Sequence, residues 1–447
     1  MSDEASTDDV REAFDPTPRV PDRDVPAMAR RLEATTTSWV EGHADRFDPF
    51  RWEDKREQNL RRKAFGEAGL YLLHAHELGG GDDLQSLSSV VADHANDERY
   101  FRLLQRRPTM VRKFAYPALY ADRSGNLRDD RLSGRLTELL NDEAVWAKQR
   151  TSFERFDLWH VAKLSGVEPP FSTDGLLAGS PLAHRPDPFR ATAKDVNGLV
   201  HELMFWRNLG MDAAGASFPD EPAPGGDLRE VLTLLLFRYV AEQNYDVGLE
   251  VVMSAVLQRT VAPDLVRTFV GHALSRAEEL GYLPKSESSL DSDPRFERFS
   301  ASASEWATHY HANLVAGFAS RVLCDHWDEF VAESAPAENH DYDHEDLLKM
   351  GRMVEALMDY DLQSGARRLR DLAGTSVAAA YPEAFDAAVR FLRNQRRPDG
   401  TFGYWTDVRS KYVSLTGDGE RFDEEIVEST TEACSAALAE IDQLASE

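Results

Sequence analysis

Residues 389–405 read Val-Arg-Phe-Leu-Arg-Asn-Gln-Arg-Arg-Pro-Asp-Gly-Thr-Phe-Gly-Tyr-Trp, which is the most distinctive pattern in the chain. A helix is predicted to end near Gln395, because Pro398 cannot continue it. Asp399 and Gly400 then predict a tight turn with a positive φ at the glycine. Three aromatic side chains follow, Phe402, Tyr404 and Trp405. A glutamine amide can bond such a turn while an aromatic ring stacks on it, so this stretch is expected to fasten one helical hairpin to the next.

The pattern of apolar residues predicts helices along most of the rest of the chain. Apolar side chains recur three and four positions apart within 60–72, 347–358 and 422–441, as on one face of a helix. No series of alternating β-branched runs bounded by Asn-Gly or Asp-Gly turns is present. The sequence therefore predicts an all-α fold with roughly a dozen or more helices of about 12 residues.

Proline- and glycine-rich breaks divide these helices into groups, at 166–191, 218–226, 283–294 and 333–344. Helix pairs separated by loops of this size favour helical hairpins arranged as an (α/α) toroid, with an open α-solenoid as the alternative. A third arrangement is two unrelated helical bundles that meet near residue 180 or 290.

The domain organisation follows from the same breaks. Residues 1–24 are acidic and interrupted by proline, so they are expected to form a disordered acidic tail. None of the later breaks is long or simple enough to be a free linker. Residues 25–447 are therefore expected to form a single helical-hairpin domain, with 215–226 as the place where two halves of it would meet.

The spacing Phe391-x3-Gln395-x4-Gly400-x-Phe402 resembles the Gln-aromatic repeat of squalene and hopene cyclases and of protein prenyltransferase β-subunits. This resemblance implies a ring of α/α hairpins around a central apolar cavity. Over its whole length the chain looks more like uncharacterised all-helical proteins of haloarchaea and actinobacteria, which also have a His-Glu-x-x-Phe/Trp helix like that of 198–206. In the cyclases the repeat is structural, so it argues for a fold and not for a reaction.

The charge of the chain limits its partners and suggests its environment. In 447 residues, 78 Asp and Glu oppose 51 Lys and Arg, for a net charge of −27, and only nine of the bases are lysine. Such a charge repels phosphate backbones and anionic lipids, so no nucleic-acid partner is expected. An acidic, lysine-poor surface is typical of a protein that works in concentrated salt, which suggests a halophile's cytoplasmic protein. The most apolar run, 231–237, is far too short to span a membrane.

The catalytic motifs of the ring proteins that this chain resembles are not found in its sequence. The Asp-x-Asp-Asp acid of the protonating cyclases is missing, as is an Asp-Asp-x-x-Asp diphosphate clamp. Cys324, Asp325 and His326 are consecutive on a predicted helix, so their side chains diverge and cannot chelate one zinc ion. No metal and no cofactor are therefore expected.

Candidate site residues come from two places in the sequence. His201, Glu202 and Asp399 are the candidates for acid–base chemistry, since glycosidases on rings of this kind need two acids in an aromatic groove. Each of them also has a purely structural interpretation. The residues expected to contact a ligand are aromatic: Trp159, Trp206, Phe402, Tyr404 and Trp405.

Two functions are compatible with these observations. The first is a binding or scaffold protein whose concave, aromatic-lined face takes an apolar small molecule, a lipid or a peptide. The alternative is a toroid-class enzyme, similar to isoprenoid or peptide cyclases and transferases or to glycosidases, that uses acid–base chemistry. The sequence leaves open the ligand, whether the ring closes, and the oligomeric state.

Overall fold

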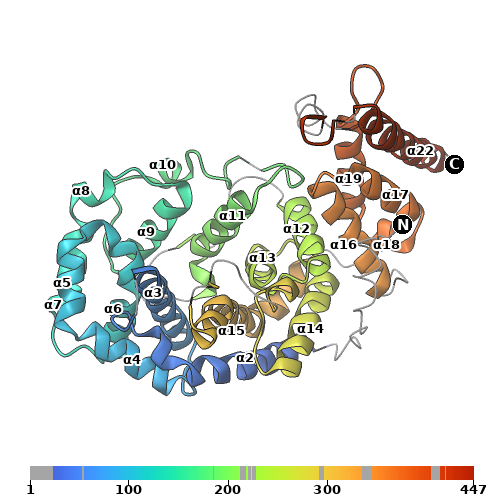
Figure 1. Cartoon of the computed structure of the whole chain (residues 1–447). Coiled ribbons are helices and arrows are strands. Elements are labelled where there is room, and N and C mark those ends of the chain that lie inside the picture. The colour runs from blue at the N-terminus through green and yellow to red at the C-terminus, as the bar shows by residue number, and fades with distance from the viewer. Residues whose placement is uncertain are drawn as a thin grey trace.

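The computed structural model describes residues 24–446 except 53–54, 185, 212–217, 220–222, 224–227, 291–295, 298, 335–341, 343, 404–412 and 418 (Figure 1). These residues form helices and loops, and they contain no β-strand beyond one isolated bridge between Asn244 and Ser286. The predicted all-α fold is therefore confirmed. No helix in this part of the chain combines the length and the apolar character that a membrane crossing requires.

The helices fall into two consecutive series. The first contains α2 (Val25–Gly42), α3 (Lys55–Glu77), α4 (Gln85–Ala95), α5 (Glu98–Arg106), α6 (Val111–Arg123), α7 (Arg131–Leu140), α8 (Glu143–Trp146), α9 (Ser152–Leu164), α10 (Thr173–Leu177), α11 (Ala193–Trp206), α12 (Arg229–Ala241), α13 (Tyr245–Gln258), α14 (Pro263–Leu280) and α15 (Ala301–Glu333), with short 3₁₀ turns η1 (Ala44–Phe47), η2 (Pro108–Met110), η3 (Asn208–Gly210) and η4 (Glu287–Ser289). The second contains α16 (His344–Met358), α17 (Leu362–Leu372), α18 (Ser376–Ala380), α19 (Pro382–Asn394), α21 (Gly419–Arg421), the π-helical turn η5 (Phe422–Glu428) and α22 (Ser429–Leu444).

Six helices of the first series, α3, α6, α9, α11, α13 and α15, are called the inner helices. Each packs on the next, from α3 to α6, α9, α11, α13 and α15, and α15 packs again on α3. Other helices lie against their outer sides, such as α2 against α15 and α4 and α7 against α6. Figure 1 shows α2 running beside α15, which joins the two ends of this series.

Two glycines let α3 and α6 approach unusually closely. A Cβ at Gly66 would lie 2.2 Å from the carbonyl oxygen of Lys113, and a Cβ at Gly69 would lie 2.3 Å from the nitrogen of Pro117. Real Cβ atoms essentially never come so near to backbone atoms. Because any side chain at these positions would push the helices apart, the two glycines set the spacing of α3 and α6.

Arg321 on α15, the last inner helix, contacts residues of both α2 and α3. The Arg321 Nε lies 2.7 Å from Glu33 Oε1 on α2, and its guanidinium lies 4.6 Å from the centre of the Tyr71 ring on α3. The Tyr71 hydroxyl is also 3.0 Å from Thr37 Oγ1 on α2. One cation therefore ties the end of the first series to its beginning.

The stretch at 389–405 lies in the second series, which packs through α16 and α19 on α12. As predicted, α19 ends at Asn394 and Gly400 has a positive φ, of 90°. The Gln395 amide donates to the Phe391 carbonyl (3.2 Å), and its oxygen accepts from the Tyr360 hydroxyl (3.2 Å). Gln395 thus fastens α19 to the turn between α16 and α17.

Phe391 links the second series to the first. Its ring stacks on that of Phe189, in the loop before α11, with centroids 4.6 Å apart. The glutamine and aromatic residues of this stretch therefore hold the second series together and attach it to the loop preceding α11.

Candidate functional site

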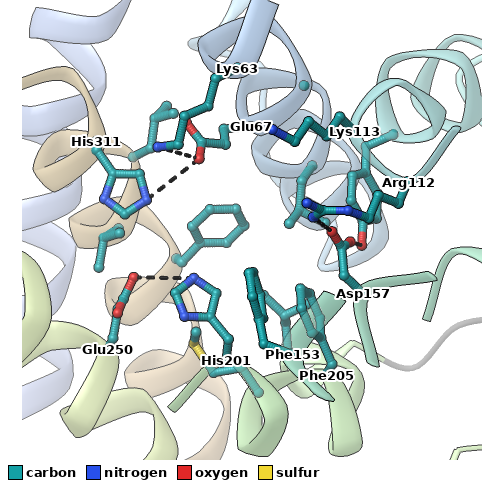
Figure 2. Close-up of a pocket in the computed structure, with 18 of the residues that line it drawn as sticks. Lys63, Glu67, Arg112, Lys113, Phe153, Asp157, His201, Phe205, Glu250 and His311 are labelled. Carbon is teal, nitrogen blue, oxygen red and sulfur yellow. Dashed lines mark hydrogen bonds and ion pairs between the residues drawn. The ribbon is translucent and has the colours of Figure 1, made fainter. Parts of the chain in front are cut away.

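The six inner helices and the turn η3 line a pocket with a volume of about 210 Å³ (Figure 2). Every inner helix contributes at least two residues to its wall. The wall is largely apolar, and its apolar side chains include Leu70, Phe153, Met204, Phe205, Met253, Leu314, Val315 and Phe318. A small ligand with an apolar body would therefore lose water from most of its surface in this pocket.

The first polar group of the pocket lies between α3 and α15. The Lys63 ammonium is 2.8 Å from Glu67 Oε1, one helical turn further along α3. The Tyr310 hydroxyl donates to Glu67 Oε2 (2.9 Å) and accepts from Lys63 (3.2 Å). Burial opposes both charges, but Lys63 and His311 lower the pKa of Glu67, and Glu67 raises the pKa of Lys63. Lys63 and Glu67 are thus a mutually neutralising pair.

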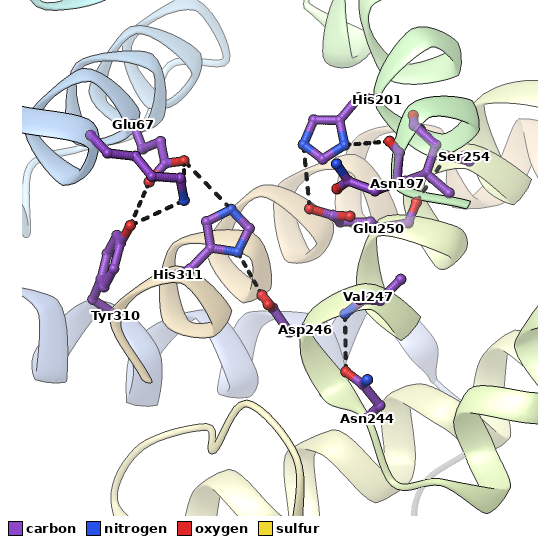
Figure 3. Close-up of polar contacts among 12 residues, drawn as sticks. Glu67, Asn197, His201, Asn244, Asp246, Val247, Glu250, Ser254, Tyr310 and His311 are labelled. Carbon is purple, nitrogen blue, oxygen red and sulfur yellow. Dashed lines mark hydrogen bonds and ion pairs between the residues drawn. The ribbon is translucent and has the colours of Figure 1, made fainter. Parts of the chain in front are cut away.

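His311 completes this group and is held by Asp246 at the start of α13 (Figure 3). The Nδ1 atom of His311 lies 2.7 Å from Asp246 Oδ1, so Nδ1 donates, and Nε2 lies 3.8 Å from Glu67 Oε1. Burial acts to lower the pKa of His311, but the Asp246 carboxylate outweighs it and raises the pKa to about 9. His311 is therefore an imidazolium at neutral pH.

A second polar group joins α6 to α9. Arg112 donates to Asp157 Oδ2 (2.7 Å) and to Glu154 Oε1 (2.5 Å). Asp157 also accepts from the Tyr116 hydroxyl (2.9 Å). Burial raises the pKa of Asp157, and Arg112 opposes that shift. The guanidinium of Arg112 is thus committed to two carboxylates.

Lys113, the next residue on α6, lines the pocket and is exposed, and its side chain makes no hydrogen bond or ion pair with any residue that the structure describes. Burial and the neighbouring Arg112 and Lys63 cations lower its pKa. Figure 2 shows the Lys113 amine directed toward the same space as Lys63 and Arg112. An anion bound there would relieve the repulsion among these cations.

The third polar group is formed by His201 on α11 and Glu250 on α13. Glu250 is 3% exposed, and its carboxyl lies 3.6 Å from His201 Nε2. The other ring nitrogen of His201, Nδ1, is 2.8 Å from the Asn197 carbonyl and donates to it. Burial raises the pKa of Glu250, and the nearby rings of His201 and His311 oppose that shift. Phe153 packs on the His201 ring with centroids 4.8 Å apart.

Of the three residues suggested by the sequence for acid–base chemistry, His201 lines the pocket. Glu202 lies on another face of α11, where it is fully buried and accepts a hydrogen bond from the Ser180 hydroxyl. Asp399 is exposed in the second series, where its Oδ1 accepts from the Thr401 nitrogen (3.0 Å) and hydroxyl (2.6 Å). The structure therefore does not bring these three side chains together.

The aromatic residues proposed for ligand binding are also separated. Trp159 and Trp206 are buried and stack on each other with centroids 6.4 Å apart, and neither lines the pocket. Phe402 is buried in the second series, where its nitrogen donates to Thr431 (2.9 Å). Tyr404 and Trp405 lie outside the described residues. A ligand role for these residues stays a prediction.

Sequence reasoning missed most of the polar residues of the pocket, although α13 carried a signal. Within residues 245–258 the only charged side chains are Asp246 and Glu250, four positions apart on an otherwise apolar helix. A charge that would be buried on such a helix needs a partner or a function. Lys63 was not selected because it belongs to the basic run 61–63, and such a run is typical of a solvent-exposed helix face.

The pocket offers no evident metal site. The part of the chain that the structure describes contains no group of three or more His, Cys, Asp or Glu side chains placed to hold a metal ion. Cys324 and Cys434 are free thiols, and burial raises the pKa of both.

One comparison with known proteins finds a family match over most of the first series of helices. A family model described as Domain of unknown function (DUF6895) matches residues 33–321. The pocket residues run from Lys63 to Phe318, so all of them lie within the matched region, whereas α16–α22 lie beyond it. No curated protein and no solved structure matches the chain.

Proposed function

We propose that this chain, which belongs to the family described as Domain of unknown function (DUF6895), binds a small organic anion with an apolar body. The binding site is the pocket between the inner helices. We also propose that these helices form a closed (α/α) toroid, because their contacts lead from α3 through five further helices back to α3. In this view residues 33–321 are the ligand-binding unit.

The charge of the pocket supports an anion. The whole chain carries −27, yet the pocket wall has four basic groups, Lys63, Arg112, Lys113 and His311, against the acids Glu67, Asp157 and Glu250. Glu67 is paired with Lys63, Asp157 with Arg112, and His311 with Asp246. Lys113 is exposed at the pocket and is the one basic group of its wall without an ion pair to a described residue, and this observation carries the proposal.

The size and lining of the pocket support a small, partly apolar molecule. Its volume of about 210 Å³ is below the ~300–1,000 Å³ of pockets for drug-sized ligands. Phenylalanine, methionine and leucine side chains cover the space between the polar groups. A short alkyl or aryl carboxylate has both of the required parts, and its apolar burial contributes about 25 cal/mol per Å².

The charge preference can be tested with two ligands of nearly equal shape, hexanoate and hexanamide. Hexanoate is expected to bind at least about tenfold more tightly, because a hydrogen bond to a charged partner contributes ~1.5–3 kcal/mol. Isothermal titration calorimetry on the full chain at fixed KCl concentration measures both affinities.

In the Lys113→Gln variant, the affinities for hexanoate and hexanamide should differ by no more than about threefold. Lys349→Gln is the matched control, because Lys349 lies on α16 with its ammonium paired to Asp346 and Glu345, outside the pocket. Equal affinities of the unmodified protein for the two ligands, or no binding of either, would contradict an anion site.

We infer in addition that the protein works in concentrated salt in the cytoplasm, as its acidic, lysine-poor composition suggests. At 1 M salt the Debye length is about 3 Å, so repulsion among surface carboxylates is screened. The Tm is therefore expected to rise between 0.15 M and 3 M KCl, as followed by circular dichroism. A Tm that is highest at 0.15 M KCl would exclude this adaptation.

A further inference from the structure

We propose that the ligand carries an ammonium group as well as an acidic group, and that Glu250 and His201 hold the ammonium group. The pocket is then a site for an ω-amino acid, whose acid contacts Lys113 and whose amine contacts α13 and α11. This inference rests on the proposed anion-binding function and specifies the chemical class of the ligand.

Glu250 is the first observation that points to a donor on the ligand. Its side chain is almost fully buried on α13 and lines the pocket, yet its carboxyl makes no hydrogen bond with any described residue. Buried polar groups in folded proteins are nearly always hydrogen-bonded, since an unpaired one is costly. A carboxyl in this position is completed by a donor from inside the pocket.

His201 restricts what that donor can be. Its Nδ1 donates to the Asn197 carbonyl, so Nε2 is the ring nitrogen left to face Glu250. Nε2 and Glu250 Oε1 face each other at 3.6 Å, which is longer than a hydrogen bond (Figure 3). An ammonium group beside Glu250 has three donors, so it can bond the Glu250 carboxylate and also an Nε2 that carries no proton.

The surrounding charges allow a cation at this position. His311 and Lys63 are the nearest cations on α15 and α3, and Asp246 and Glu67 neutralise them at 2.7 and 2.8 Å. A ligand ammonium would neutralise Glu250 in the same manner. Each charged group of α3, α13 and α15 that lines the pocket would then have a partner of opposite sign.

The two ends of the ligand must be far apart. Lys113 lies on α6 and Glu250 on α13, and these helices are three steps apart in either direction along the six inner helices. Figure 2 shows Lys113 and Glu250 on opposite sides of the pocket, with apolar side chains between them. The geometry therefore fits an amine and an acid at opposite ends of a chain, and it does not fit an α-amino acid.

Calorimetry with two homologous series tests this proposal. The probes are the ω-amino acids from 4-aminobutanoate to 8-aminooctanoate, each compared with the unsubstituted alkanoate of the same carbon number. At the best chain length the ω-amino acid is expected to bind at least about tenfold more tightly than its alkanoate, since a charge-assisted hydrogen bond is gained. The α-amino isomer, 2-aminohexanoate, should show no such gain.

Variants assign the effect to the proposed groups. Glu250→Gln is isosteric and should remove the gain of the ω-amino acid while it leaves the alkanoate affinity within about threefold. Glu345→Gln, at an exposed position of α16, should change neither affinity. A thermal melt of each variant shows that the fold is retained.

The outcomes separate this inference from the proposed function. If alkanoates bind through Lys113 but no ω-amino acid binds better, the anion site stands and the ammonium site is wrong. An ω-amino acid whose gain survives in Glu250→Gln also overturns the ammonium site. If neither series binds, the anion-binding function itself fails.

Discussion

Replacing Gly69 with alanine is expected to lower the free energy of unfolding by about 2–3 kcal/mol and to abolish ligand binding. The added Cβ would lie 2.3–2.6 Å from three atoms of Pro117, two of them in the backbone of α6. Flexible side chains can move aside, but two packed helices can only separate, and overpacking of this kind costs ~1–3 kcal/mol or more. Separation would also move Lys113 away from Lys63, because the two residues lie on these helices.

Gly134→Ala provides the opposite control. Gly134 is in the middle of α7, and a Cβ there would meet no atom within 4 Å. Alanine should therefore stabilise the protein by up to about 1 kcal/mol through helix propensity alone. Urea denaturation of both variants measures the two effects. A Gly69→Ala variant that is as stable as Gly134→Ala would mean that the close approach of α3 and α6 is not required.

Replacing Asp246 with asparagine is expected to destabilise the protein by about 3 kcal/mol at pH 6 and by much less at pH 10. Burial acts to lower the pKa of His311, but Asp246, helped by Glu67, raises it from about 6.5 to about 9, and each pKa unit corresponds to ~1.4 kcal/mol. Because the folded pKa is the higher one, this stabilisation is fully present below pH 6.5. It is lost as the pH rises through about 9.

Urea denaturation of the unmodified and variant proteins between pH 6 and pH 10 measures this difference. Asp45→Asn is the control, since Asp45 and its partner Arg51 are 61% and 68% exposed, and exposed ion pairs contribute ~0–1 kcal/mol. A loss of stability in Asp246→Asn that is the same at every pH would show that the imidazolium is not what Asp246 stabilises.

The helices were accessible from the sequence because their signal is local. The apolar spacing at 347–358 predicts α16, and Pro398 with Gly400 predicts the turn after α19, since backbone geometry limits both. How the helices are arranged depends on contacts such as that of Arg321 with Tyr71, which lie 250 residues apart in the chain. No local pattern records such a contact.

The pocket was harder to predict than the helices, because its residues come together only when distant parts of the chain pack. His201 was selected for its aromatic neighbours and does line the pocket, but its partner Glu250 lies 49 positions further along the chain on another helix. Lys113 stands out because it lines the pocket without an ion pair, which is a property of the folded chain. Glu202 had the same sequence context as His201 and is directed elsewhere, since adjacent residues on a helix point about 100° apart.

The pairing of α3 with α15 has a consequence for how the protein is made. The Lys63–Tyr310 contact joins residues 247 positions apart, which a ribosome takes about 12–50 s to synthesise at ~5–20 residues per second. During that interval the apolar sides of α2 and α3 that α15 covers have no native partner. A nascent chain halted before residue 300 should therefore be captured by holding chaperones and be sensitive to protease, whereas one extended past residue 333 can complete the first series of helices.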